Sequence, residues 1–459
     1  MSSYVIAAVP VHGHVAPLLP IAAHLVARGD TVRFLTGARF AASVSATGAT
    51  HVALPPESDF DDRNVVAQFP ERAEMSPLAA VAFDIEHIFI RPGEGQYAGL
   101  RQLLGELPTD AVIVDPLFAG GVLLAELPAG ERPPIVVAGV VPLALPGPGL
   151  APYGMGVRPM GGPIGALRNR ALEGLNARVL RPAEEAGTTI MRRIHGREGS
   201  GPIMDWLTRA DAVIQLSVPG FEYPRPEPKA RLSFTGMIST SSALEHPRPS
   251  WWHELDGSRP VVHVTQGTIA NDDLTELIVP TMHALADQDV LVVVATGGRP
   301  VADLGPLPAN ARAAEFLPYT ELFERTDLFV TNGGYGGVQF ALSHGVPVVV
   351  APGKEDKVEV AARITWTGTG VNVRKQRPSE RRLRRAVRRV LTKSRYREAA
   401  SALAAEMAAA PGAKGFAAVV DGVVAGWPGA DGAAPVHEAA SGHGAARSHG
   451  AARSQQGVA

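Results

Sequence analysis

The stretch VPVHGHVAPLLPIAAHLVARG, residues 9–29, joins the end of an apolar run to a helical pattern and places two histidines at the junction. The run YVIAAVP, which leads into it, is short and apolar, as is typical of a buried strand. The helix is expected to begin at a proline, whose fixed backbone angle suits a first helical turn. His12 and His14 are therefore expected at the carboxyl end of a strand, where open α/β sheets bind ligands.

Similar short apolar runs alternate with helical patterns along most of the chain. The alternation predicts βαβ units, and hence parallel sheets with helices on both faces. One series of strands is expected at residues 4–10, 31–37, 50–55, 110–115 and 133–142, and a second at residues 260–268, 289–298, 311–318, 328–334 and 347–352. The fold class is therefore expected to be α/β, with two Rossmann-like, doubly wound domains facing each other across a cleft.

The length of 459 residues also favours two domains, because a single hydrophobic core rarely grows beyond about 250–300 residues. Residues 1–240 are assigned to the first domain, with a proline-rich linker from about residue 219. Residues 241–427 are assigned to the second domain and its closing helices. Residues 428–459 contain HGAARS twice and few large apolar side chains, so they are expected to form a disordered, low-complexity tail.

Two long segments, residues 56–100 and 143–205, interrupt the alternation with prolines and glycines. Insertions of this length in a compact domain usually line a binding cleft, so both are assigned to substrate binding. The acidic run DFDD at residues 59–62 lies in the first of them, away from any expected strand. It is interpreted as part of a loop and not as a metal site.

Composition excludes several classes of function. The formal net charge of −2 gives no overall field that would attract nucleic acid or an anionic membrane, so a small or neutral partner is favoured. The chain has no cysteine, which excludes disulfides, thiolate metal sites and a cysteine nucleophile and favours the cytoplasm. No signal peptide is expected at the N-terminus. No membrane span is expected either, because prolines and glycines break the longest apolar stretch, residues 133–152.

The two histidines suggest acid–base chemistry. A neutral imidazole at the strand end can accept a proton from a hydroxyl, provided that a carboxylate fixes its tautomer. Asp115 is the candidate carboxylate, since it ends the strand AVIVD at the same edge of the same sheet. The alternative is structural, with one histidine and Asp115 each capping a helix. No further His or Asp cluster at ligand spacing accompanies the histidines, so metal binding is disfavoured.

A second candidate site is the glycine-rich turn TNGGYGG, at residues 331–337, between a strand and a helix. Its backbone N–H groups can approach a phosphate at the helix N-terminus. The spacing fits neither the dinucleotide-binding nor the P-loop pattern, and a plain glycine turn is the alternative. Glu355 and Asp356, in GKEDK at residues 353–357, can accept hydrogen bonds from sugar hydroxyls or simply complement a helix dipole.

The segment at residues 379–398 is rich in arginine and carries an apolar stripe formed by Leu383, Val387, Val390 and Leu391. This spacing predicts one buried face of a helix. A solvated basic face is the favoured interpretation, and contact with acidic lipid headgroups is the alternative.

With these motifs the chain resembles the family-1 glycosyltransferases, over about residues 4–425. These are metal-independent inverting enzymes of the GT-B fold, and many bacterial members act on natural products such as macrolides. The match of GHVAP to the family's Gly-His-x-x-Pro implies that His14, rather than His12, is the catalytic base, with Asp115 as its partner. The segments TQGT, FLPYTELFERTDLFVTNGG and HGVPVVVAPGKED match the family's donor signature.

The resemblance implies a donor site in the second domain, formed by Thr265, Gly267, Thr268, Phe316, Leu317, Asn332, Gly333, Gly334, Gly336, Gly337, Gln339, Glu355, Asp356 and Lys357. Several positions depart from the family pattern: Asn332 replaces a histidine, Gly337 a serine, Phe340 a glutamate, Phe316 a tryptophan and Lys357 a glutamine. Loss of the glutamate removes an acceptor for two ribose hydroxyls, which leaves UDP- and dTDP-sugars as candidate donors.

The expected activity is transfer of a hexose, with inversion, from a UDP- or dTDP-sugar to a hydroxyl of a small hydrophobic acceptor such as a polyketide, macrolide or phenolic. No metal or other cofactor is expected. The nucleotide sugar is consumed in the reaction and is therefore a co-substrate. A nucleotide-sugar 2-epimerase, which shares the fold, is one alternative. A degenerate homologue that only binds is the other.

Overall fold

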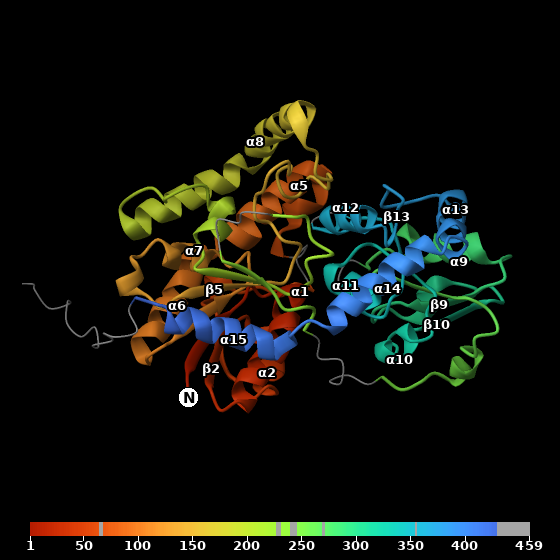
Figure 1. Ribbon diagram of the computed structural model, residues 1–459, viewed down its shortest axis with the longest axis horizontal. Coiled ribbons are helices and arrows are strands. Elements are labelled where there is room, and N and C mark those ends of the chain that lie inside the picture. Colours follow the sequence, from red (N-terminus) through yellow and green to blue (C-terminus); the bar gives the residue numbers. More distant parts are fainter. Residues whose placement is uncertain (64–67, 226–230, 239–245, 269–270, 354–355, 429–459) are drawn as a thin grey trace, which may run out of the picture.

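The computed structural model describes residues 1–63, 68–225, 231–238, 246–268, 271–353 and 356–428, which form two α/β domains (Figure 1). The first domain contains a parallel sheet of seven strands in the order β3-β2-β1-β4-β5-β6-β7. Its strands are β1 (Ser3–Ala7), β2 (Thr31–Thr36), β3 (Thr50–Ala53), β4 (Ala111–Val114), β5 (Ile135–Gly139), β6 (Ala212–Gln215) and β7 (Leu232–Phe234).

The second domain contains a parallel sheet of six strands in the order β10-β9-β8-β11-β12-β13. Its strands are β8 (Val261–Thr265), β9 (Leu291–Ala295), β10 (Ala311–Ala314), β11 (Leu328–Thr331), β12 (Val348–Val350) and β13 (Gly370–Asn372). The predicted α/β class with two doubly wound domains is confirmed.

Helices cover both faces of each sheet, which explains why the strands are almost entirely apolar. In β1, for example, Val5 and Ala7 pack in one core cluster while Tyr4 and Ile6 pack in another. The helices are α1 (His12–Val15), α2 (Leu19–Ala27), α3 (Ala41–Ser45), α5 (Pro77–Asp84), α6 (Gly93–Glu106), α7 (Ala119–Ala125), α8 (Gly162–His195), α9 (Ile278–Leu285), α10 (Tyr319–Phe323), α11 (Tyr335–Ser343), α12 (Lys357–Thr367), α13 (Glu380–Leu391), α14 (Arg395–Ala408) and α15 (Gly412–Ala425).

The strand order reverses at one place in each sheet, between β1 and β4 in the first and between β8 and β11 in the second. Ligands bind open α/β sheets at such switch points, outside the carboxyl ends of the strands. The segments that carry His14 and Asp115 follow β1 and β4. The TQGT segment and the glycine turn follow β8 and β11. These four segments therefore lie at the two switch points.

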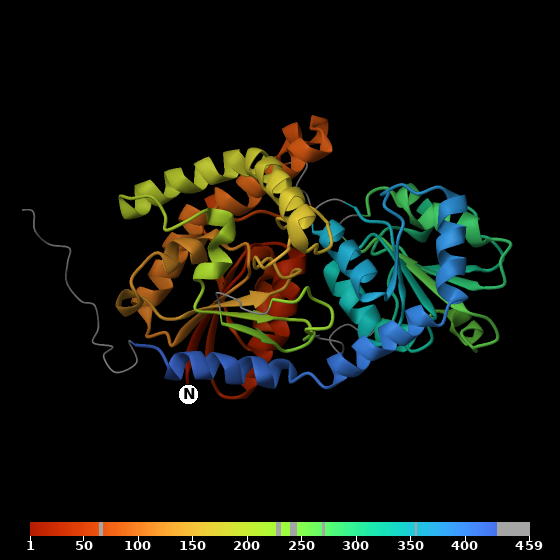
Figure 2. The ribbon, with the colours of Figure 1, turned by 45° about the horizontal axis from the view of Figure 1, so that its top comes forward.

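The two insertions of the first domain are largely helical. Residues 77–106 form α5, a π-helical turn (Ile85–Ile90) and α6, and α8 runs for 34 residues through Pro182. α8 packs against α5 and the π-helical turn and arches over the first domain (Figure 2). Side chains of both insertions line the cleft between the domains, as their placement in the sequence predicted.

The second domain ends earlier than the sequence assignment of residues 241–427 expected. α15 crosses back to the first domain and packs on α2 and β6 (Figures 1 and 2). Phe416, Val420 and Val423 recur at helical spacing and join the core cluster on that face of the first sheet. The closing helix therefore belongs to the first domain, because its apolar face completes that core.

The proline-rich segment from residue 219 is only partly a linker, because β7 within it pairs with β6. Val218 and Phe221, just after β6, pack in a core cluster of the second domain. The two domains are thus joined by buried apolar contacts as well as by the chain.

The arginine-rich segment forms α13, with Leu383, Val387 and Val390 buried in the second core as the spacing predicted. A break at residues 392–394 separates α13 from α14. Among the described residues, no single helix is both long enough and apolar enough to cross a membrane. The helices α14 and α15 meet these two criteria only when they are taken together, and the pair is bent by 54°. The predicted tail lies outside the described residues from residue 429 onward.

Candidate active site

A cleft of about 2400 Å³ lies between the domains and is lined from both sides. The first domain contributes His12, His14 and the apolar side chains of its insertions. The second contributes the glycine turn, the TQGT segment and the start of α12. Both switch points therefore open into one shared space.

His14 and Asp115 meet at the first switch point. The Nδ1 atom of His14 lies 2.9 Å from Oδ1 of Asp115, and both side chains are buried. The same carboxylate accepts hydrogen bonds from the backbone N–H groups of Val9 (2.7 Å) and Leu117 (2.8 Å). Because an ionised carboxylate only accepts, Nδ1 carries the proton and Nε2 keeps a free lone pair. The pair thus has the geometry of a histidine base fixed by an aspartate.

The first helical turn begins at His12 and not at the proline, so both histidines lie inside α1. Asp62 holds the start of this turn, since its Oδ2 accepts the backbone N–H of His12 at 2.7 Å. Sequence reasoning set the DFDD run aside as a loop, and the structure shows that its last residue supports the helix that carries His14. Burial and the Arg39 guanidinium lower the pKa of His12, which favours its neutral form.

Apolar side chains line much of the first domain's side of the cleft. The Phe89 ring lies 6.0 Å from the His14 ring, measured between centroids. Others are Phe60, Ile85, Ile88, Val122, Val141, Leu145 and Trp206. Such a surface favours a hydrophobic ligand whose reacting group lies against His14.

The glycine turn lies across the cleft, between β11 and α11. Gly333 has a φ of 97°, and a Cβ there would lie 3.0 Å from Val350, so only glycine fits without strain. A Cβ at Gly334 or Gly336 would meet no atom within 4 Å. The start of α11 is therefore uncrowded at these two glycines among the described residues, at the end of the helix where the first N–H groups lack intrahelical partners and an anion can bind.

The TQGT segment is tied to this turn. The side-chain amide of Asn332 donates to the Gln266 carbonyl at 2.6 Å. Thr265 is buried, and its hydroxyl accepts the N–H of Gly267, so it shapes the turn from within. Thr268, by contrast, is exposed on the cleft.

Three other predicted donor residues have different surroundings from those expected. Leu317 is buried in a core cluster of the second domain. Phe316 does not line the cleft and stacks on His246, with ring centroids 4.8 Å apart. Gln339 borders the cleft, but it is 1% exposed and its amide donates to Ser217 of the first domain at 2.8 Å. The sequence motif did not show which of these side chains turn toward the cleft.

Asp356 and Lys357 line the cleft at the start of α12, where the sequence predicted a sugar contact. Glu355 lies outside the described residues. One turn further along α12, Glu359 and Arg363 are buried and charged, and sequence reasoning missed both. Their spacing of four residues indicates a pair on one face of a helix, but nothing in the sequence indicates that this face is buried. Within the described part of the chain, no group of three His, Asp or Glu residues has the arrangement to hold a metal ion.

Comparison with known proteins gives consistent matches. Residues 279–422 match the family model described as the C-terminal domain of erythromycin biosynthesis protein CIII-like proteins. The chain is 39% identical over 423 residues to 4'-demethylrebeccamycin synthase of Lentzea aerocolonigenes, which covers 91% of this chain and 99% of that protein.

Solved structures with similar folds include the glycotransferase of kitacinnamycin, with a TM-score of 0.68 and 21% identity, covering 92% of this chain and 98% of that one. Another is the spinosyn rhamnosyltransferase SpnG complexed with thymidine diphosphate. It has a TM-score of 0.63 and 18% identity, and the match covers 92% of this chain and all of that one.

Proposed function

Because the chain belongs to the family-1 glycosyltransferases of the GT-B fold, related to the bacterial natural-product enzymes, we propose that it transfers a hexose with inversion from a nucleotide diphosphate sugar to a hydroxyl of a small hydrophobic acceptor. The observation that carries this proposal is the buried His14–Asp115 pair, which opens into the same cleft as the glycine turn. The relative named as a rebeccamycin-type synthase supports a natural-product acceptor.

In the proposed reaction, His14 takes the proton of the acceptor hydroxyl while that oxygen attacks the anomeric carbon of the sugar. The bond from this carbon to the diphosphate oxygen breaks on the opposite face, which inverts the configuration. Asp115 holds the His14 tautomer and stabilises the imidazolium that forms. The start of α11, with Gly334 and Gly336, stabilises the negative charge of the departing diphosphate.

The direct test incubates the purified protein with UDP- or dTDP-glucose and a panel of phenolic and polyketide acceptors. The expected result is a glycosylated acceptor, with one nucleoside diphosphate released for each. Conversion of the donor sugar with no acceptor present would instead support an epimerase. Tight donor binding without any turnover would support a homologue that only binds.

Metal independence is tested separately. Because backbone N–H groups and a helix terminus are proposed to stabilise the diphosphate, treatment with excess EDTA is expected to leave turnover unchanged. The measurement compares initial rates before and after chelation and after addition of Mg²⁺ or Mn²⁺. A loss of activity that either ion restores would contradict this part of the proposal.

The donor nucleotide is proposed to be only weakly discriminated. The Phe340 ring packs against Phe323 (5.3 Å) and His344 (4.7 Å) and borders the cleft, so this position supplies no carboxylate to a ribose. The Gln339 amide donates its N–H to Ser217, and its Oε1, which has no hydrogen-bond partner among the described residues, is the one acceptor beside Phe340 that can replace part of that carboxylate. We therefore expect a kcat/KM for dTDP-glucose within about 10-fold of that for UDP-glucose, since each lost hydrogen bond is worth only about 0.5–1.5 kcal/mol.

Phe340→Glu is expected to shift this ratio toward UDP-glucose by about 1 kcal/mol, because the new carboxylate can accept from the ribose hydroxyls. Phe340→Leu is the matched control, since it removes the ring contacts without adding an acceptor. Parallel kinetics on the two donors decide the matter. A parent enzyme that prefers UDP-glucose by several orders of magnitude would show that other residues hold the ribose.

A further inference from the structure

The loop that follows β5, residues 140–157, forms much of the first domain's wall of the cleft. Its side chains at Val141, Leu143, Leu145 and Tyr153 line the space on the acceptor side. The loop is fastened to the second domain at two places. Both attachments lead to α12, the helix that begins next to Asp356.

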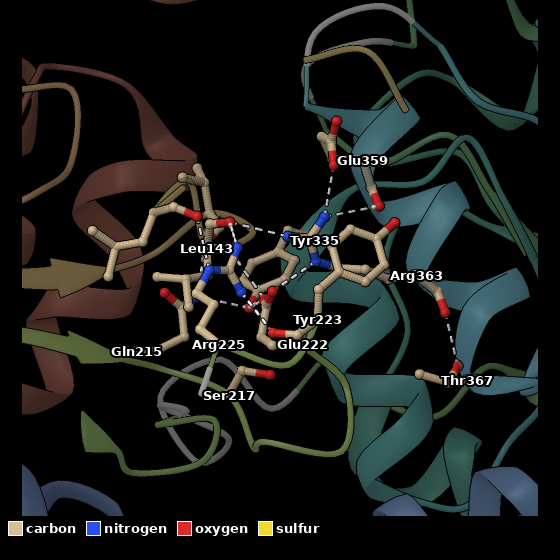
Figure 3. Close-up of polar contacts among 12 residues, drawn as sticks. Leu143, Gln215, Ser217, Glu222, Tyr223, Arg225, Tyr335, Glu359, Arg363 and Thr367 are labelled. Atoms are coloured by element: carbon tan, nitrogen blue, oxygen red, sulfur yellow. Dashed lines mark hydrogen bonds and ion pairs between the residues drawn. The ribbon is translucent and has the colours of Figure 1, made fainter. Parts of the chain in front are cut away.

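The first attachment is at Leu143. Its carbonyl accepts a hydrogen bond from the Arg363 guanidinium at 3.1 Å, and its N–H donates to Glu222 at 3.2 Å. Glu222 belongs to the segment after β6 and is itself paired with Arg363, with Oε2 and Nε 2.7 Å apart. One end of the loop is therefore held directly by an arginine of the other domain (Figure 3).

The second attachment is near the other end of the loop. The N–H groups of Gly154 and Gly156 both donate to Oε1 of Glu359, at 3.0 and 2.8 Å. Gly156 has a φ of 59°, and a Cβ there would lie 2.9 Å from the Cβ of Val358. The loop thus lies directly on the first turn of α12, and a glycine is required for this contact.

The two attachments meet at Arg363. Its NH1 group pairs with Oε2 of Glu359 at 2.8 Å, and its guanidinium lies 4.5 Å from the centre of the Tyr223 ring (Figure 3). Arg363, Glu222 and Glu359 are 1%, 2% and 4% exposed. Burial acts to lower the pKa of Arg363, but the two carboxylates raise it overall, so the guanidinium remains charged.

A buried charge cluster is a costly way to join two domains, because apolar residues of similar volume usually give equal or greater stability. The cluster instead fixes the relative orientation of the groups that it joins. Glu359 accepts two defined N–H groups, and Arg363 fixes the orientation of both carboxylates. Such an arrangement sets the position of the loop more narrowly than apolar packing does.

We propose that Glu359, held by Arg363 and Glu222, is a positioning residue for glycosyl transfer, which fastens the acceptor-side loop to α12, the helix that begins at the proposed sugar-binding residues Asp356 and Lys357. The inference rests on the proposed function. With the loop in place, the acceptor hydroxyl lies in line with the anomeric carbon and water does not. With the loop released, water reaches the same carbon.

The two outcomes have different products. In transfer, the acceptor oxygen bonds to the anomeric carbon, the carbon–diphosphate bond breaks and His14 takes the acceptor proton. In hydrolysis, water supplies the oxygen and the proton, and the products are free sugar and nucleoside diphosphate. The ratio of free sugar to glycosylated acceptor therefore reports the position of the loop. A change in overall stability alone leaves this ratio unaltered.

The test compares Glu359→Ala and Glu359→Gln with the parent enzyme. Glu359→Ala is expected to lower transfer roughly 10-fold, the scale produced by displacing reacting groups by less than 1 Å, and to raise the ratio of free sugar to glycosylated acceptor. Glu359→Gln keeps an oxygen for the two N–H groups, so its ratio is expected to rise less. Both products are quantified in the same reaction, at saturating donor.

Glu126→Ala is the matched control for loss of a buried carboxylate. Glu126 is 8% exposed, accepts the N–H of Ser200 and pairs with Arg197, but it does not line the cleft. This variant is expected to lower the melting temperature while leaving the product ratio at the parent value. An equal rise of the ratio in Glu126→Ala and Glu359→Ala would overturn the inference, as would a parent-like ratio in Glu359→Ala.

A second pair of variants covers the case in which Glu359→Ala does not fold. Gly156→Ala pushes the loop away from Val358 without disturbing the charges, and it is expected to raise the ratio. Gly154→Ala has a similar left-handed backbone, but its Cβ meets no atom within 4 Å, so a smaller rise is expected. Equal ratios in these two variants and the parent would also overturn the inference. A parent enzyme that glycosylates no acceptor would instead contradict the proposed function itself.

Discussion

His14→Ala is expected to lower turnover at least about 100-fold, because a positioned general base contributes about 10²–10⁴-fold to a reaction of this kind. The substitution removes the imidazole whose Nδ1 lies 2.9 Å from Oδ1 of the buried Asp115 and whose Nε2 is the proposed base. Donor affinity is expected to remain close to that of the parent, since the proposed diphosphate site lies in the second domain. Steady-state kinetics and titration with nucleoside diphosphate separate the two effects.

His12→Ala is the matched control for this prediction. It removes a histidine from the same helical turn, but the contact of His12 with Asp62 is made by its backbone N–H, which the substitution keeps. A much smaller loss of turnover is therefore expected. Equal turnover of His14→Ala and the parent on an acceptor hydroxyl of high pKa would contradict the assignment. A large loss in His12→Ala alone would transfer the role to that residue.

Arg363→Met is expected to cost about 3–5 kcal/mol in the free energy of unfolding, the range seen when one partner of a buried ion pair is removed. The change leaves Glu222 and Glu359 buried without the positive charge that faces both. Unfolding in urea, followed by circular dichroism, measures the loss. The triple variant Glu222→Gln, Glu359→Gln, Arg363→Met is expected to recover much of it, because no uncompensated charge remains.

Arg397→Met provides the comparison with an ordinary ion pair. Arg397 pairs with Asp327 at 3.0 Å, and both side chains are more than 40% exposed. Such surface pairs contribute about 0–1 kcal/mol, so a correspondingly small loss is expected. An Arg363→Met variant as stable as Arg397→Met would show that the buried cluster carries no net electrostatic stabilisation.

The sequence predicts the features of this protein that depend on local pattern. Apolar runs of strand length predicted five strands of each sheet but not β6, β7 or β13, and the segments after β1 and β4 predicted that His14 and Asp115 would lie at one edge of the first sheet. Parallel strands place their carboxyl ends together, so this pairing requires no knowledge of distant contacts.

Features that depend on which surfaces meet were not predictable in the same way. The apolar spacing of Phe416, Val420 and Val423 predicts a buried helix face but not the domain that buries it. Glu359 and Arg363 look like an exposed pair on a helix until the segment that carries Glu222 covers them. In the same way, Leu317 and Gln339 lie in donor motifs, but their neighbours in space decide where their side chains turn.

The return of α15 to the first domain also determines how this enzyme can be recombined with its relatives. The chain passes between the domains twice, and the two passages touch, with the N–H of Gly412 donating to the Thr235 carbonyl at 2.8 Å. A chimera made with a single junction after β7 would import a foreign α15 and place it on α2 and β6. An exchange of donor modules therefore needs two junctions, one near Gly236 and one near Ala410, whose side chain lies against Gly236. With both junctions, the native α15 stays on its own sheet and only the second domain is replaced.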